Sequence, residues 1–135
     1  MNVWVALAHE IHPHHDAAVA WGKSLPRDAT PCFCRITQLG LLRLLTNPSA
    51  MGGDVQTQAQ AWAVYDGFLR TAGARMLGDP QGIDAVFRQQ TRRNEVSTKQ
   101  WADGYLAAFS MAAEIPLVTF DHALAGKVKG TVLLS

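Results

Sequence analysis

Apolar residues recur along much of the chain with the period of a helix, and this pattern predicts five helices. Apolar side chains recur every three to four residues, which is typical of helices with one buried face. The segment 37–45 is an example, with Gln38, Leu41, Leu42 and Leu45 on one stripe. The predicted helices span residues 13–22, 37–45, 55–70, 81–90 and 98–113.

Residues that start or stop helices define the expected helix ends, and the spacing of apolar residues predicts which positions face inward. Pro13 opens the first helix, Gly22 stops it, and Ser97 caps the last one. The expected inward positions of the helices at 55–70, 81–90 and 98–113 are Ala59, Trp62, Ala63, Asp66, Leu69, Ile83, Val86, Phe87, Trp101, Tyr105, Ala108, Phe109 and Ala112.

Four short apolar runs lie between or after these helices and predict strands. They span residues 32–36, 75–77, 115–120 and 131–134. The run 115–120 is continuously apolar, as a buried parallel strand is. Strands that alternate with helices indicate an α/β fold with a mostly parallel sheet.

Length and composition narrow the class of protein. The chain has 135 residues, which predicts a single domain over 1–135, and its 48% hydrophobic content excludes a disordered tail. A net charge of +1 excludes nucleic-acid binding through bulk charge, although residues 70–100 carry six basic and three acidic groups. That segment is either a solvated helix face or a rim that faces phosphate.

The cysteines and the apolar runs predict a cytoplasmic protein without a membrane span. Cys32 and Cys34 cannot form a disulfide framework and are expected to be reduced thiols. The longest apolar runs have six residues, whereas a span needs about 20. We also expect no secretory signal at the N-terminus.

Two acids and an amide stand where an α/β fold places ligands. Asp121 directly follows the run 115–120, and ligands bind beyond the carboxyl ends of parallel strands. Asp103 and Gln38 each stand among the apolar residues of a helix, where a polar group needs a partner. These residues suggest a divalent-metal site. The structural alternatives are a first-turn acid for Asp103, a helix N-cap for Asp121 and a backbone-tethering amide for Gln38.

Histidines form a second cluster near the N-terminus, at His9, His12, His14 and His15. A structural zinc site needs four ligands, and no distant Cys/His pair has suitable spacing. A surface loop that starts a helix is the favoured interpretation. A small flavodoxin-like nucleotide binder is disfavoured because no Gly-rich phosphate loop is present.

Four stretches of the sequence together resemble the PIN-domain ribonucleases, specifically the VapC-type toxins of bacterial toxin–antitoxin pairs. They run in the family's order and spacing over nearly the whole chain: NVWVAL at 2–7, RITQLGLLRLLTNP at 35–48, WADGYLAAF at 101–109 and LVTFD at 117–121. The resemblance implies a three-layer α/β/α fold. It also implies metal-dependent endoribonuclease activity with Mg (or Mn), an RNA substrate, a cognate antitoxin, and a homodimer or toxin–antitoxin hetero-oligomer.

The resemblance assigns roles to four residues. Asp103 and Asp121 match acids that hold the metal in the family, and Gln38 falls where many members carry Glu. Asn2 matches the Asn of an Asp-x-Asn motif whose Asp is absent here. Gln38 and Asn2 would give polar support without charge. The alternative is a catalytically crippled PIN-fold binding module that retains antitoxin or RNA binding.

The same resemblance predicts that the chain is truncated at its N-terminus. Family members begin with an apolar strand that ends in Asp-x-Asn and lies at the centre of the sheet. Here Met1 occupies the x position, which is often Val, and a GTG codon read as a start would be written as Met. We therefore expect an apolar strand ending in Asp upstream of Met1. Without it, its two neighbours would have unpaired edges.

Overall fold

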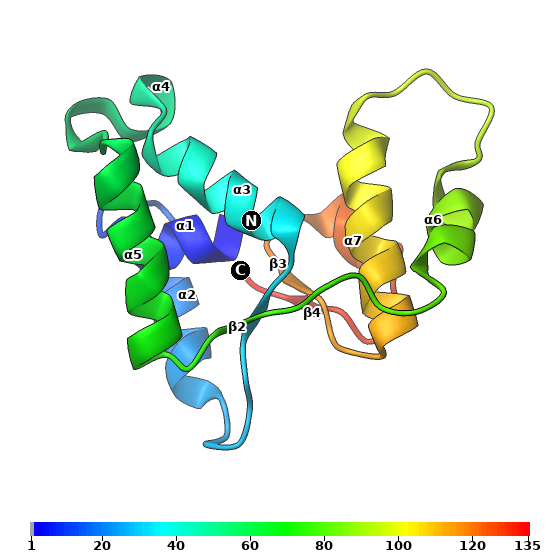
Figure 1. Cartoon of the computed structure of the whole chain (residues 1–135), viewed down its shortest axis with the longest axis horizontal. Coiled ribbons are helices and arrows are strands. Elements are labelled where there is room, and N and C mark those ends of the chain that lie inside the picture. Colours follow the sequence, from blue (N-terminus) through cyan, green and yellow to red (C-terminus); the bar gives the residue numbers. More distant parts are fainter. Residues whose placement is uncertain (1) are drawn as a thin grey trace. The chain divides into compact units, whose positions relative to one another are not determined.

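The chain folds into two compact units, Met1–Gly78 and Asp79–Ser135. The computed structural model describes residues 2–135 and the side chains of residues 3–135. Helices and short parallel strands make up both units, which supports the α/β class (Figure 1). None of the helices described between residues 2 and 135 is long and apolar enough to cross a membrane.

The first unit consists mainly of helices around a pair of parallel strands. Its elements are α1 (Asn2–Ala8), α2 (His15–Ser24), β1 (Cys32–Phe33), α3 (Arg35–Leu45), α4 (Pro48–Met51), the 3-10 helix Gly52–Asp54, α5 (Gln58–Thr71) and β2 (Arg75–Met76). Strand β1 pairs with β2 in parallel, with Cys32 opposite Arg75 and Phe33 opposite Met76.

Aromatic stacking organises the core of the first unit. Phe33 is fully buried, and its ring stacks on Trp4 with the centroids 4.0 Å apart. Tyr65 of α5 contacts Phe33 from another side, and Leu41 and Leu45 of α3 complete the cluster. The apolar run at the N-terminus is thus a core helix, and Val3–Ala6 are buried in it.

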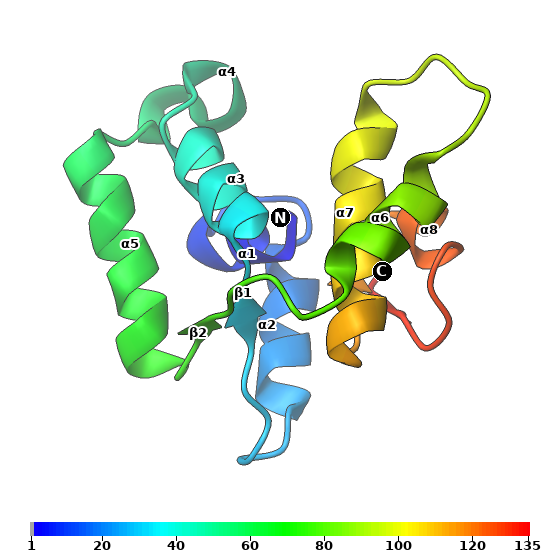
Figure 2. The same cartoon turned by 45° about the vertical axis from the view of Figure 1, so that its right-hand side comes forward.

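The second unit has a helix pair followed by another pair of strands. Its elements are α6 (Ile83–Thr91), α7 (Lys99–Ala113), β3 (Val118–Thr119), α8 (His122–Ala125) and β4 (Val132–Leu133). Helices α6 and α7 pack side by side (Figures 1 and 2). Strand β3 pairs with β4 in parallel, with Val118 opposite Val132.

The parallel pairing is confirmed, but the predicted strands are longer than those observed. Residues 35 and 36 belong to α3, because the backbone N–H of Cys34 donates to Thr37 Oγ1 (2.9 Å) and starts the helix there. The strand expected at 115–120 is limited to Val118–Thr119. Ile115 instead completes the end of α7, since its N–H donates to the Ser110 carbonyl (3.1 Å).

Several predicted helix limits are also wrong. Helix α2 begins at His15 and not at Pro13, and α5 and α6 begin at Gln58 and Ile83 instead of residues 55 and 81. Helix α2 continues past Gly22 to Ser24. The N-cap residue of α7 is Thr98 instead of Ser97, and its helical backbone (φ −82°, ψ −32°) carries no side-chain cap.

The buried face of α5 differs from the predicted one, and that of α7 agrees in part, since Ala108 and Phe109 are buried as predicted. Ala61 and Tyr65 are the buried residues of α5, whereas Trp62 is 47% exposed. On α7, Trp101 is exposed. The buried residues of this helix begin with the polar Asp103 and with Gly104 and continue with Leu106–Ser110. The prediction assigned the large aromatic residues to the core, but small residues allow the closest helix contacts. The predicted stripe of α3 is confirmed, with Gln38, Leu41 and Leu45 buried.

Candidate active site

Asp103 lies in the second turn of α7 and is buried. Its residue is 9% exposed, and its neighbours along the buried face are Gly104 and Ala107. A carboxylate in such surroundings requires a compensating charge. Lys99, one turn earlier, supplies it: Nζ lies 3.8 Å from Asp103 Oδ2.

Asp121 lies at the junction between β3 and α8 and is the N-cap of that helix. Its Oδ1 accepts hydrogen bonds from the backbone N–H groups of Ala123 (2.9 Å) and Leu124 (3.1 Å). The N–H of Asp121 donates to Thr119 Oγ1 (3.0 Å), which fixes the turn. The predicted N-cap role of Asp121 is therefore confirmed.

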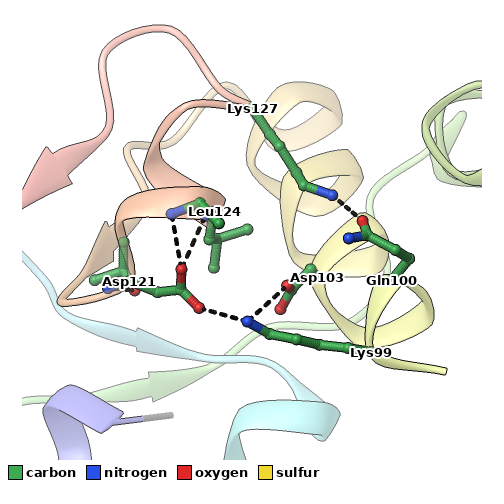
Figure 3. A network of polar contacts seen from close by, with 8 residues as sticks. Lys99, Gln100, Asp103, Asp121, Leu124 and Lys127 are labelled. Atoms are coloured by element: carbon green, nitrogen blue, oxygen red, sulfur yellow. Dashed lines mark hydrogen bonds and ion pairs between the residues drawn. The ribbon is translucent and has the colours of Figure 1, made fainter. Parts of the chain in front are cut away.

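Lys99 joins the two carboxylates (Figure 3). Its Nζ donates to Asp121 Oδ2 at 3.1 Å, while the same atom faces Asp103. The structure thus brings together two acids that are 18 positions apart in the sequence. Lys127 lies nearby, where its ammonium group donates to the Gln100 side-chain oxygen.

The charges of this cluster stabilise one another. The pKa of Asp121 is lowered, first by the backbone N–H of Leu124 and then by the Lys99 hydrogen bond. The pKa of Lys99 is raised by its hydrogen bond to Asp121 and by the charges of Asp121 and Asp103. Asp121 and Lys99 are therefore both charged at neutral pH.

Gln38 belongs to the first unit and has a partner there. Its side-chain oxygen accepts a hydrogen bond from Arg35 Nη1 on the same helix, and the residue is 5% exposed. The amide binds a guanidinium group, so the expected tether to backbone is wrong. Asn2 begins α1, but its side chain lies outside the described residues. The roles of both residues at a metal site stay predictions.

The histidine cluster behaves as a loop that precedes a helix. His15 begins α2, and its Nδ1 lies 2.6 Å from the Ala6 carbonyl oxygen. His9 Nε2 is 3.0 Å from Asp54 Oδ2. Across residues 2–135 no three His, Cys, Asp or Glu side chains are grouped so that they could hold a metal ion.

Sequence reasoning missed Lys99 as a member of the site. In the sequence, Lys99 stands out only as one of the basic residues of the segment 70–100. The available signal was the spacing of four between Lys99 and Asp103, which puts both on one face of a helix. The contact to Asp121 depends on tertiary structure and has no local signal.

The structure combines helices with short parallel strands, and it places one acid near the start of a helix and another after a strand. Both features agree with the PIN-domain resemblance of the sequence. The PIN domain family matches residues 1–129, and the chain belongs to that family. It is 40% identical over 126 residues to Ribonuclease VapC41 of Mycobacterium tuberculosis (strain CDC 1551 / Oshkosh), which covers 90% of this chain and 86% of the relative. The same figures hold for Ribonuclease VapC41 of strain ATCC 25618 / H37Rv. The resemblance to VapC-type PIN ribonucleases is thereby confirmed.

Proposed function

We propose that the chain is a divalent-metal-dependent endoribonuclease that hydrolyses RNA phosphodiester bonds. The observation that carries this proposal is the convergence of Asp103 and Asp121 on one cation, the Lys99 ammonium group. Similarity to proteins named Ribonuclease VapC41 supports the reaction class.

The donor set fits Mg²⁺ or Mn²⁺. Both ions take hard oxygen ligands, and Mg²⁺ in proteins is held by one or two carboxylates with waters at the remaining positions. Asp103 and Asp121, which lie together in the second unit, would be those ligands. When bound, the metal would activate a water and offset the charge that develops on the phosphate.

The protein's contribution is to hold these carboxylates in fixed directions. Asp103 is fixed by its buried position on a 15-residue helix, α7. Asp121 is fixed by two backbone hydrogen bonds to Oδ1, so its Oδ2 is the oxygen that remains for a cation. Rigid carboxylates reduce the reorganisation needed to bind the ion and the substrate.

A structured or single-stranded loop of RNA is the proposed substrate. Support comes from a small pocket at the beginning of α7, lined by Thr91, Arg93, Glu95, Ser97, Gln100 and Trp101. Trp101 is 59% exposed and can stack on a base, and Arg93 can contact a phosphate. This interpretation favours the phosphate-facing rim over the solvated helix face for this part of the basic segment.

The proposed partner is a cognate antitoxin, in a homodimer or a toxin–antitoxin hetero-oligomer. Leu39 of α3 and Trp62 of α5 are 49% and 47% exposed, which favours an apolar contact surface on these two helices. The apolar run at the N-terminus does not add to this surface, because Val3–Ala6 are buried in the first unit.

Cleavage of RNA by the purified chain tests the proposal. Native protein with Mg²⁺ or Mn²⁺ should cut a mixed single-stranded RNA, and Asp103→Asn should lower the rate on the order of 100-fold or more. Asp84→Asn is the matched control, because Asp84 is an exposed acid of the same unit that pairs with Arg88. Equal cleavage by native protein and Asp103→Asn would refute the role of Asp103.

The alternative is a binding module that keeps the fold without the activity. It is favoured by the neutral Gln38 and by the presence of only two carboxylates in the described cluster around Lys99. RNA or antitoxin binding with no metal-dependent cleavage, in protein whose fold is intact, would establish this alternative.

A further inference from the structure

Lys99 places a positive charge at the position that a metal ion would need. Its Nζ lies 3.1 Å from Asp121 Oδ2 and 3.8 Å from Asp103 Oδ2 (Figure 3). They belong to the two carboxylates that the proposed function takes as metal ligands. A divalent ion bound between the two carboxylates would take the place of this ammonium group, because two cations held that close together repel each other.

The three side chains differ in solvent exposure, and this difference would allow a metal ion to replace the Lys99 ammonium group. The Asp103 and Asp121 side chains are 13% and 25% exposed, whereas the Lys99 side chain is 63% exposed. The lysine reaches the acids from solvent on a flexible four-carbon stem. Its ammonium group can therefore leave without movement of α7, while the carboxylates stay in place.

We propose that Lys99 is an exchangeable counter-ion of this site. In the metal-free protein its ammonium group balances the two carboxylates and keeps them together. A divalent ion displaces it from Asp121, and the freed ammonium group then becomes available to a phosphate of the RNA. The inference rests on the proposed function, since it takes Asp103 and Asp121 as the metal ligands.

This exchange predicts opposite effects of Lys99 on the two ligands. Before RNA binds, the ammonium group competes with the metal, so removing it should tighten metal binding. After the metal binds, the same group attracts phosphate, so removing it should weaken RNA binding. A lysine that only stabilised the fold would weaken both.

Metal affinity of the full chain tests the first effect without any measurement of activity. Mn²⁺ binding is followed by the EPR signal of the free ion for native protein, Lys99→Met, Lys99→Arg and Lys127→Met. Lys127→Met is the matched control, since it removes the same charge from a lysine that bonds Gln100. Lys99→Met should bind Mn²⁺ about five- to tenfold more tightly, Lys127→Met within about twofold of native, and Lys99→Arg close to native.

Binding of a labelled single-stranded RNA, measured by anisotropy with saturating Ca²⁺ as the metal probe, tests the second effect. Lys99→Met should weaken it more than Lys127→Met does. Circular dichroism establishes that each variant is folded. Unchanged or weaker Mn²⁺ binding by folded Lys99→Met, or an equal gain in Lys127→Met, would overturn the exchange.

The outcomes separate this inference from the proposed function. If native protein cleaves RNA but Lys99→Met does not gain Mn²⁺ affinity, the exchange is wrong and the nuclease stands. If Asp103→Asn abolishes Mn²⁺ binding and Lys99→Met strengthens it, but no RNA is cut, the exchange stands and the nuclease is wrong.

Discussion

Gly104 allows α6 and α7 to approach closely beside Asp103, and replacing it tests how tightly that contact is packed. A Cβ added at Gly104 would lie 2.3 Å from Thr91 Cγ2 and 3.7 Å from Thr91 Cβ. Carbon atoms in favourable contact are about 3.5–4.0 Å apart, so only the methyl group of Thr91 clashes. Rotating that side chain away would break the hydrogen bond from its hydroxyl to the Phe87 carbonyl (2.7 Å).

The expected magnitude is a difference between two effects. Overpacking of this kind costs about 1–3 kcal/mol, while replacing a helical glycine by alanine gains up to about 1 kcal/mol. Gly104→Ala should therefore lower the free energy of unfolding by about 1–2 kcal/mol. Thr91→Ser removes the clashing methyl group and keeps the hydroxyl, so in that background Gly104→Ala should be neutral or stabilising.

Urea denaturation of the four proteins of this double-mutant cycle measures the coupling. We expect about 1–3 kcal/mol of interaction between the two substitutions, which is within the range for residues in direct contact. Equal destabilisation by Gly104→Ala in both backgrounds would show that Thr91 is not the obstacle. A change in the urea m-value would indicate a different denatured or native ensemble instead.

Two further predictions concern the first unit. Phe33→Ala removes a fully buried ring that stacks on Trp4 at 4.0 Å, and it should cost about 3–5 kcal/mol in urea denaturation; a loss below 1 kcal/mol would contradict this core. Burial, followed by the charges of His14, His9 and His15, lowers the pKa of His12 from 6.5. The unfolded chain thus binds more protons, so stability should fall as the pH decreases from 6.5 through the lower folded pKa. His12→Gln should flatten this part of the urea-midpoint profile, and an unchanged slope would contradict it.

Helices α2, α3, α5, α6 and α7 were predictable because each carries its own local signal, whereas the shorter α1, α4 and α8 were not predicted. The stripe of Gln38, Leu41 and Leu45 on α3 has the helical period and is buried as expected. The helical period predicted the wrong buried face where a large aromatic residue lies on an Ala-rich helix. On α5, Ala61 is almost fully buried and Trp62 is exposed, because a small residue permits close packing that no propensity records.

Strand lengths were less predictable because they depend on pairing partners. The apolar segment 115–120 has the composition of a buried strand, yet only Val118–Thr119 pair, and their partner is β4. In the described part of the chain each strand has one partner. The continuous sheet, its central strand and an extension upstream of Met1 stay predictions.

Asp121 shows that the structural and functional interpretations of one residue need not compete. As an N-cap, Asp121 uses Oδ1 for the N–H groups of Ala123 and Leu124, and Asp and Asn serve almost equally well in that role. The cap alone therefore does not require a charge. The charge acts through Oδ2, which the cap directs to Lys99 and, through it, to Asp103. A local motif that sequence reasoning treats as an alternative to a metal ligand is thus the device that would orient that ligand.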